Sequence, residues 1–263
     1  MRIGIITGSG TEGWPLDGTP ARRVVTTKYG QVPVTEGMAG GAEVVHVARH
    51  EPGHRRLSNQ VNHRANIAAL LEAGVQALVS FTVCGGVDKR AEPGSLVIFD
   101  DLYFPSNRLP DGTACTWFGE PGEQGRGHWI FDAPFSGPLR RALIAATPGG
   151  TTVDRGTYGH VDGPRFNSRS EVAALAAAGV TAVSQTAGPE VVLAGEAELP
   201  MALVGYVTDY ANGVAPPEPA GALATRLKDS SRAFAGLAAR ALPALAALEE
   251  RPPAAGSVYR FGS

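Results

Sequence analysis

Polar side chains and glycines gather at the end of an apolar stretch, residues 77–86, which reads Ala-Leu-Val-Ser-Phe-Thr-Val-Cys-Gly-Gly. The stretch begins as a nearly continuous apolar and β-branched run, which is typical of a strand buried on both faces. Thr82 and Cys84 then supply a hydroxyl and a thiol, and two glycines leave the backbone open. Strand ends of this kind bind ligands in open α/β sheets, because backbone N–H groups and short side chains converge there on an anion. We therefore expect the functional site to form around this strand end.

A glycine-rich loop, residues 7–13, follows the first apolar run of the chain. Its spacing matches G-x-G-x-x-G, but a dinucleotide site needs the loop to open a helix, and Pro15, Gly18 and Pro20 would break a helix there. With Ser9 at its tip, the loop has the N–H groups and the hydroxyl to hold a single phosphate. An ordinary tight turn is the alternative, because glycine marks turns more often than anion sites.

An arginine and a histidine, Arg49 and His50, follow residues 43–48, which alternate like a strand. A guanidinium offers a planar fork of donors and an imidazole adds a short donor, so the pair suits an oxyanion. A solvated basic loop is the alternative, because charged residues are mostly exposed and further basic residues follow at 54–56.

Polar residues also follow two later predicted strands. Residues 181–186 end at Gln185 and Thr186, and residues 201–207 lead into Asp209 and Asn212. The carboxyl ends of such strands meet at one edge of a sheet, so these groups join the candidate site.

Two ring side chains have both a structural and a functional interpretation. His128 follows residues 103–127, a stretch rich in proline, glycine and aromatics that is too long for a plain connection and is a candidate substrate loop. A lone histidine of this kind is either structural or functional. Phe166, in the loop 162–171, suits either stacking on a flat ligand or anchoring the core.

Strands and helices alternate along the chain that must position these groups. The helix expected at 62–73 crosses over into the central strand, as in a right-handed βαβ unit. We predict one α/β domain over residues 1–251 and a C-terminal tail, residues 252–263, that is poorly ordered or contacts a partner. The other expected helices are 138–146, 172–178, 191–197 and 223–248, and the other expected strands are 3–6, 24–33, 43–48, 93–100 with its turn, 151–157, 181–186 and 201–207.

Composition narrows the class of partner. With 43% hydrophobic and 18% charged residues among 263, the chain can bury a large core. A formal net charge of −2 gives no basic field for nucleic acid or an anionic membrane, so a small molecule is favoured. No apolar segment approaches the roughly 20 residues of a membrane span, and the two cysteines form neither a metal-ligand spacing nor a disulfide framework. We expect a soluble, cytoplasmic protein.

Short motifs follow one another in a fixed order along about residues 3–212. They are Gly8-Ser9-Gly10, Ala48-Arg49-His50, Asn66, Thr82-Val83-Cys84-Gly85, Pro93-Gly94, Asp162-Gly163-Pro164-Arg165-Phe166, Pro189-Glu190-Val191-Val192-Leu193-Ala194 and Thr208-Asp209-Tyr210. Any one of them is weak, but in this order they resemble the trimeric purine nucleoside phosphorylases, specifically the methylthioadenosine phosphorylase branch.

The resemblance implies a three-layer single domain with a central mixed β-sheet flanked by helices. It implies inorganic phosphate as co-substrate, with no cofactor and no metal. Donors and hydroxyls of the kind it places at the phosphate bind a dianion and aim one oxygen at the anomeric carbon of the ribose. The implied phosphate site consists of Ser9, Arg49, His50, Thr82, the backbone of Val83, and Thr186.

The resemblance also implies a nucleoside site. Phe166 would lie against the base, and Gln185 would lie next to the ribose, where the family usually has Met. Asp209 would contact the purine near N7 and relieve the negative charge of the leaving base; with Arg49 and His50 it forms the implied catalytic set. His128 would reach the 5′ side from a neighbouring subunit, which implies a homotrimer or a dimer of trimers. Cys84, Gly85 and Asn212 complete the implied set.

The expected reaction is phosphorolysis of 5′-deoxy-5′-methylthioadenosine, or a related 5′-modified purine nucleoside, to free base and ribose 1-phosphate. The branch usually carries a second Asp two residues after Asp209, but Ala211 stands there, so a 6-oxopurine nucleoside is an alternative substrate. Asn212 would suit either base, since an amide both donates and accepts. A non-catalytic nucleoside-binding homologue is a second alternative, and a Cys-His hydrolase using Cys84 is a lesser one.

Overall fold

Strand β5 (Ala77–Gly86) is the centre of the sheet in the computed structural model, which describes residues 1–262 except 10, 12, 150, 220, 249 and 250. Strand β12 (Met201–Tyr210) pairs parallel along nearly the whole of one edge of β5. On the other edge, β1 (Arg2–Thr7) pairs with residues 77–80 only, and β11 (Val180–Ser184) pairs antiparallel with Gly85 and Gly86. The sheet therefore forks along β5, and neither β1 nor β11 pairs with residues 81–84.

The fork joins two groups of strands into a mixed eleven-stranded sheet within the described residues. On one side, β1 continues parallel into β4 (Ala42–Ala48), and the long hairpin β2 (Asp17–Thr27) and β3 (Gly30–Ala39) follows. On the other side, β11 continues into parallel β10 (Thr157–His160) and β7 (Asp101–Tyr103), while β12 continues into β6 (Leu96–Ile98) and β9 (Thr152–Val153).

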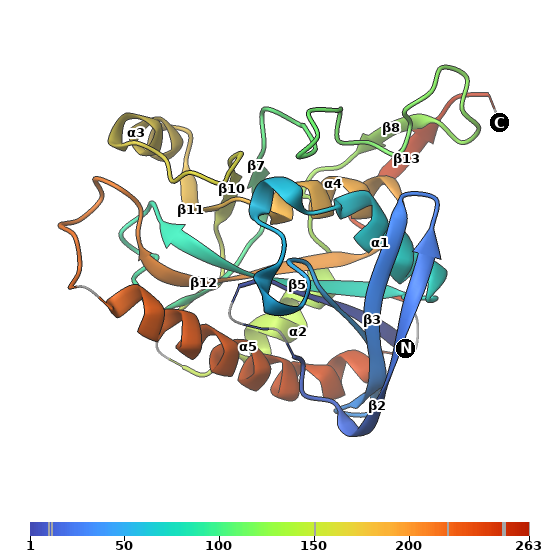
Figure 1. Ribbon diagram of the computed structural model, residues 1–263, viewed down its shortest axis with the longest axis horizontal. Helices are drawn as coiled ribbons and strands as arrows, with labels where there is room; N and C mark the ends of the chain where they lie inside the picture. Colours follow the sequence, from blue (N-terminus) through green and yellow to red (C-terminus); the bar gives the residue numbers. More distant parts are fainter. Residues whose placement is uncertain (10, 12, 150, 220, 249–250, 263) are drawn as a thin grey trace.

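Helices cover both faces of the sheet, as the three-layer prediction requires (Figure 1). One apolar core includes side chains from α1 (His63–Glu72) and α4 (Ala187–Glu196). A second core, on the opposite face, includes side chains from α2 (Gly137–Ala146) and α5 (Ala222–Ala246). A smaller cluster packs α3 (Arg169–Ala177) against β11. The predicted three-layer α/β fold is confirmed.

Several expected elements differ in extent. The single strand expected at 24–33 is instead parts of β2 and β3, because the chain turns at residues 28–29 and Gly30 has φ 138°. The expected strand 151–157 is divided between β9 and β10. Helix α4 begins at Ala187, four residues earlier than expected. Two short 3-10 helices, Pro52–His54 and Ser58–Gln60, lie in the loop between β4 and α1.

The C-terminal tail is more ordered than expected. Residues Ser257–Arg260 form strand β13, which pairs antiparallel with β8 (Gly127–Ile130), in a two-stranded sheet at the upper right of Figure 1. The expectation of a poorly ordered tail was wrong for these residues, because pairing with a strand more than a hundred residues earlier cannot be read from local sequence. No helix in the described part of the chain has the length and apolarity to cross a bilayer.

Candidate active site

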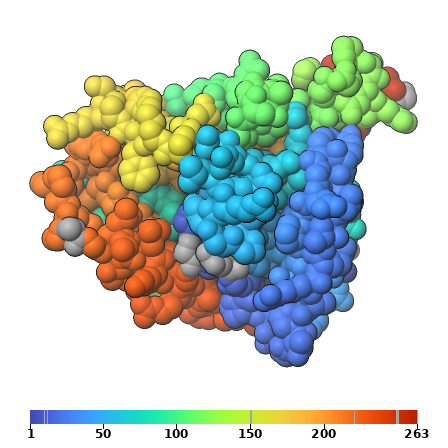
Figure 2. Space-filling view, in the orientation of Figure 1, coloured from blue at the N-terminus to red at the C-terminus, as the bar shows by residue number. Residues whose placement is uncertain are grey.

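A cavity of about 500 Å³ opens at the fork of the sheet, where residues 81–84 of β5 lack a strand partner on one edge. In the space-filling view it is hollowed between the segments near residues 50–60 and 160–170 and helix α5 (Figure 2). One end, here called the phosphate end after the sequence-based prediction, is lined by Ser9, Arg49, His50, Thr82 and Thr186. The other, here called the base end, is lined by Phe166, Asn167, Asp209, Ala211 and Asn212.

The Arg49 guanidinium is fixed inside the protein at the phosphate end. Its side chain is 1% exposed, and Nε and Nη2 donate to the two carboxylate oxygens of Glu190 at 2.7 and 3.0 Å. Nη2 also donates to Ser80 Oγ at 2.7 Å, and Nη1 donates to the Phe81 carbonyl at 2.9 Å. Among the described residues these bonds use four of the five guanidinium N–H groups. The alternative of a solvated basic loop was wrong for Arg49.

The remaining Nη1 hydrogen of Arg49 and the His50 ring lie close to the glycine loop. A Cβ built on Gly8 would lie 2.5 Å from Arg49 Nη1 and 3.8 Å from His50 Nε2, so a larger residue would occupy the space in front of both. The loop stays next to these groups because the ends of β1 and β4 are in register, with Thr7 opposite Ala48 and the Arg49 N–H donating to the Thr7 carbonyl at 3.0 Å. The glycine therefore keeps this corner of the cavity open.

His50 is neutral in the folded protein. Its Nδ1 lies 2.8 Å from the Arg56 carbonyl, which only accepts, so Nδ1 carries the hydrogen and Nε2 is left as an acceptor. Burial, and then the neighbouring Arg49 charge, lower the pKa of His50 to about 4. With Glu190 neutralising Arg49, the phosphate end carries little net charge before a ligand enters.

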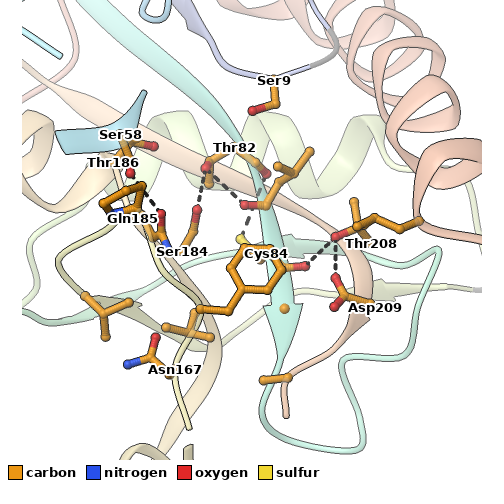
Figure 3. A pocket seen from close by; sticks show the side chains of 18 of the residues that line it. Ser9, Ser58, Thr82, Cys84, Asn167, Ser184, Gln185, Thr186, Thr208 and Asp209 are labelled. Carbon is orange, nitrogen blue, oxygen red and sulfur yellow. Dashed lines mark hydrogen bonds between the residues drawn. The ribbon is translucent and has the colours of Figure 1, made fainter. Parts of the chain in front are cut away.

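Hydroxyl groups complete the phosphate end (Figure 3). Thr82 Oγ1 and Ser184 Oγ form a hydrogen bond of 3.2 Å. Thr82 Oγ1 also lies within hydrogen-bond distance of the Val83 carbonyl, at 3.3 Å. Thr186 caps α4 without a side-chain capping bond, so its hydroxyl is free of that role. The Ser9 hydroxyl borders the same cavity, and Gly10 of the motif lies outside the described residues.

Cys84, Val83 and Gly85 also line the cavity. Burial raises the pKa of the Cys84 thiol far above its ordinary value, which keeps it protonated and a poor nucleophile. The Cys-His hydrolase alternative is therefore disfavoured by the structure.

Asp209 is the carboxyl group of the base end. Thr208 Oγ1 donates to it at 2.7 Å, and burial raises the pKa of Asp209 above its ordinary value despite this bond (Figure 3). A carboxyl with a raised pKa is suited to hold or share a proton with a ligand atom. Asn212 Nδ2 donates to the Asn167 carbonyl at 2.7 Å, so the amide nitrogen of this side chain is engaged within the protein.

Phe166 and Gln185 differ in how tightly the protein holds them. The Phe166 ring lines the cavity yet is 69% exposed, so it is not the core anchor that was the alternative interpretation. The Gln185 amide is engaged at both ends, since Oε1 accepts from Ser58 Oγ at 2.8 Å and Nε2 donates to the Arg165 carbonyl at 2.8 Å.

Two sequence-predicted parts of the site lie away from this cavity. His128 is exposed on β8, where its ring contacts Phe261 at 5.4 Å, and it does not line the cavity of its own chain. The candidate substrate loop, residues 103–127, contributes no residue to the cavity lining; residues 108–110 and 112 line a second, smaller cavity instead.

Glu190 and Ser80 are the site residues that sequence reasoning missed. Glu190 is fully buried and receives hydrogen bonds from Arg49 and from Ser80 Oγ, the latter at 2.6 Å. The signal that could have identified Glu190 is its position as the single charged residue in the apolar run 187–195, because a buried carboxylate needs a cationic partner. In the described part of the chain, no three His, Cys, Asp or Glu side chains are grouped to hold a metal ion.

Comparisons with known proteins identify relatives of this chain. The model of the phosphorylase superfamily matches residues 2–246. The chain is 38% identical over 222 residues to a probable 6-oxopurine nucleoside phosphorylase of Thermococcus kodakarensis, which covers 82% of this chain and 81% of that protein. It is 37% identical to the S-methyl-5′-thioadenosine phosphorylase of Mycobacterium tuberculosis, over 81% of this chain and 77% of that protein. Methylthioadenosine phosphorylase from Schistosoma mansoni, solved with adenine, superposes with a TM-score of 0.85 at 26% identity, covering 94% and 92% of the two chains.

Proposed function

Since the chain belongs to the phosphorylase superfamily, we propose that it catalyses the phosphorolysis of a purine nucleoside to free base and ribose 1-phosphate. The observation that carries this proposal is the corner beside Gly8. Arg49 Nη1, which has one N–H without a partner among the described residues, and His50 Nε2 both lie near the position that a Cβ on Gly8 would take. The hydroxyl-bearing residues Ser9, Thr82 and Thr186 line the same cavity. Their hydroxyls and the Val83 backbone are suited to the remaining oxygens of a phosphate ion.

The neutral state of His50 fits a phosphate that still carries one proton. Nε2 accepts, so it pairs with the P–OH group of hydrogen phosphate, while Arg49 and the hydroxyls donate to the charged oxygens. Because Glu190 and Ser80 hold Arg49, the guanidinium needs no reorganisation when the anion arrives. The bound phosphate is thereby oriented for attack on the anomeric carbon.

Asp209 supplies the second half of the reaction. The C–N glycosidic bond breaks as a phosphate oxygen bonds to the anomeric carbon, and negative charge develops on the leaving purine. A protonated Asp209, with its pKa raised by burial, gives a proton to the purine, and the proton released by hydrogen phosphate restores the balance. Overall the phosphate proton ends on the base, and ribose 1-phosphate leaves as a dianion.

The leading substrate is 5′-deoxy-5′-methylthioadenosine or a related 5′-modified purine nucleoside. Leu223 and Leu227 of α5 give the cavity an apolar wall that suits a methylthio group, and a relative named for this activity is 37% identical. A 6-oxopurine nucleoside is the second candidate, because Ala211 lacks the acceptor expected for a 6-amino group and relatives named for 6-oxopurines are 38% and 35% identical.

We also propose a homotrimer, or a dimer of trimers, in which His128 completes the site of a neighbouring copy. His128 lies on the small sheet β8–β13, whose exposed apolar residues are suited to burial against another chain. These exposed residues are Ile130, Phe131, Tyr259 and Phe261. In this proposal phosphate is the co-substrate and no cofactor takes part. The two free, buried cysteines fit a reducing cytoplasm. There the products would enter purine salvage.

A nucleoside panel with and without phosphate tests the proposed function. Methylthioadenosine, adenosine, inosine and guanosine are incubated with the protein, and the free base is measured. We expect base release with phosphate and none without it, with methylthioadenosine fastest. Faster release from inosine or guanosine would assign the 6-oxopurine activity instead, and the absence of release from all four would refute both.

A further inference from the structure

A second cavity, of about 280 Å³, shares two lining residues with the main cavity described above. Its lining includes Ser58, His63, His160, Asp162 and Gln185. Ser58 and Gln185 line both cavities, and the hydrogen bond between Ser58 Oγ and Gln185 Oε1 at 2.8 Å forms part of the wall between them. Gly163 packs directly against this bond, where a Cβ would collide with both polar atoms. The two cavities therefore meet at two hydrogen-bonded polar side chains.

His63 gives this cavity an unmet need for hydrogen bonds. The residue is 1% exposed, and neither ring nitrogen has a hydrogen-bond partner among the described residues. Buried polar groups in native proteins are nearly always satisfied by protein, water or ligand, and an unsatisfied one costs about 1–3 kcal/mol. A polar occupant of the cavity would supply the missing partner.

The charges around the cavity favour a neutral occupant. Burial lowers the pKa of both His63 and His160 to about 3, so both rings are uncharged. Arg108 and Asp162 in the lining have opposite signs. Beyond the His63 ring, with Nδ1 3.8 Å from Glu190 Oε1, the Arg49–Glu190 pair is likewise neutral overall.

The available donors and acceptors favour a hydroxyl group. A neutral imidazole presents one donor and one acceptor. His160 Nδ1 accepts from the Gly188 N–H at 3.4 Å, which leaves its Nε2 as a donor. A cation would lie against the His160 donor, and an anion would lie against the acceptor nitrogen of His63. A hydroxyl can pair with both, because it donates and accepts.

We propose that this cavity is a subsite for a neutral, hydroxylated substituent on the sugar of the nucleoside. The proposal rests on the proposed function and on the sequence-based expectation that the ribose lies next to Gln185, which lines both cavities. A substituent on the ribose edge that faces Gln185 enters the second cavity when the Ser58–Gln185 bond opens, and its hydroxyl pairs with His63. The bonds broken and formed in phosphorolysis are unchanged.

The test compares ether derivatives of whichever panel nucleoside the protein cleaves fastest. The 2′-O- and 3′-O-(2-hydroxyethyl) ethers are measured beside the matching propyl ethers, which have the same length but lack the hydroxyl. We expect one hydroxyethyl ether to be cleaved with a kcat/KM within tenfold of the parent and at least tenfold above its propyl ether. Equal rates for the two ethers, or a loss above a hundredfold at both positions, would overturn the proposal while leaving the proposed function intact.

The variant His63→Phe assigns the effect to this cavity. Phenylalanine keeps the ring and removes both nitrogens, so the tenfold preference for hydroxyethyl over propyl should fall to about one. Retention of the full preference in a folded His63→Phe variant, judged by its melting temperature, would contradict the assignment. The wild-type comparison needs no variant, so it decides the proposal even if His63→Phe does not fold. If no panel nucleoside releases base with phosphate, the proposed function fails and the subsite fails with it.

Discussion

The two ends of the main cavity are built differently. At the phosphate end, Arg49 is buried and held by Glu190, Ser80 and the Phe81 carbonyl. At the base end, Phe166 is 69% exposed and Asp209 is only partly buried. The arginine of the phosphate end is held in place by its bonds within the protein. The side chains of the base end remain accessible to a ligand or to another copy of the chain.

The difference shows which part of the reaction the fold itself encodes. An anion of constant shape is served by a rigid set of donors, because a preorganised site pays no reorganisation energy when charge develops. The relatives are named for different purine nucleosides. The residues of the base end are exposed or only partly buried, so they can be replaced without disturbing the core. The phosphate end should therefore govern stability and activity together, and the base end should govern activity alone.

Acidification should destabilise the folded protein through its buried neutral histidines. Burial lowers the pKa of His50 and His46 to about 4, and of His63 and His160 to about 3, from an ordinary value of 6.5. The unfolded chain binds these protons and the folded chain does not, so the stabilisation is complete above pH 6.5 and is lost as the pH falls toward these values. Each histidine changes the free energy of unfolding by at most about 1.4 kcal/mol per pH unit, and the four together change it by at most about 5 kcal/mol per pH unit.

Asp209 acts with the opposite sign, because its raised pKa makes the folded chain bind its proton more readily than the unfolded chain. Urea unfolding at pH 7, 6 and 5 measures the balance. We expect the free energy of unfolding to fall by at least about 2 kcal/mol between pH 6 and 5, because the histidines outnumber Asp209. A flat or rising profile over that unit would contradict the burial of neutral histidines.

The substitution Arg49→Met separates the two roles of the phosphate end. Removing the guanidinium leaves Glu190 buried without a counter-charge, so the free energy of unfolding should drop by about 3–5 kcal/mol. The kcat/KM for phosphate should fall about a thousandfold, as when a preorganised donor to a reacting anion is lost. Urea unfolding and phosphate titration measure the two effects.

The double variant Arg49→Met with Glu190→Gln is the matched control. It removes the unpaired charge, so most of the stability should return while phosphate use stays impaired. Unchanged phosphate dependence in either variant would remove Arg49 from the phosphate site.

The substitution Asp209→Asn tests whether the base end acts on activity alone. An amide cannot transfer a proton to the leaving purine, so base release should slow by about a hundredfold to a thousandfold. The free energy of unfolding should change by less than about 1 kcal/mol, because the partly buried carboxyl is already disfavoured as an anion. Turnover equal to the wild type would exclude Asp209 as the proton donor.

The substitution Phe166→Leu should have the smallest effect. Loss of ring stacking on the base should raise the KM for the nucleoside about tenfold, as for other bases stacked on aromatic side chains. Because the ring is exposed, stability should stay within about 0.5 kcal/mol of the wild type, and the KM for phosphate should not change. A drop in stability without a change in nucleoside KM would make Phe166 a structural residue.

The sequence allowed the phosphate end to be predicted more fully than its supports. The resemblance of the short motifs to the purine nucleoside phosphorylases grouped Ser9 with Arg49. The structure brings the two residues to one cavity because they follow β1 and β4, which are adjacent parallel strands. Glu190 was missed because its contact with Arg49 joins residues 141 positions apart. A lone charge in an apolar helix shows that a partner exists but not which one.

The fork of the sheet was also beyond sequence reasoning. The antiparallel pairing of β11 with the last residues of β5 depends on long-range packing, and so does the β8–β13 sheet. The roles of His128 and Phe166 remain predictions for a different reason. They depend on molecules that lie outside this single chain.

In the proposed reaction, the fork of the sheet holds phosphate beneath a sugar whose purine is leaving. The most direct measurement is the ratio of phosphate consumed to base released, followed in one reaction with the fastest nucleoside of the panel. We predict one phosphate consumed for each base, with the phosphorus recovered as ribose 1-phosphate or its 5-modified form. Base released without phosphate consumption, yielding the free sugar, would contradict the account.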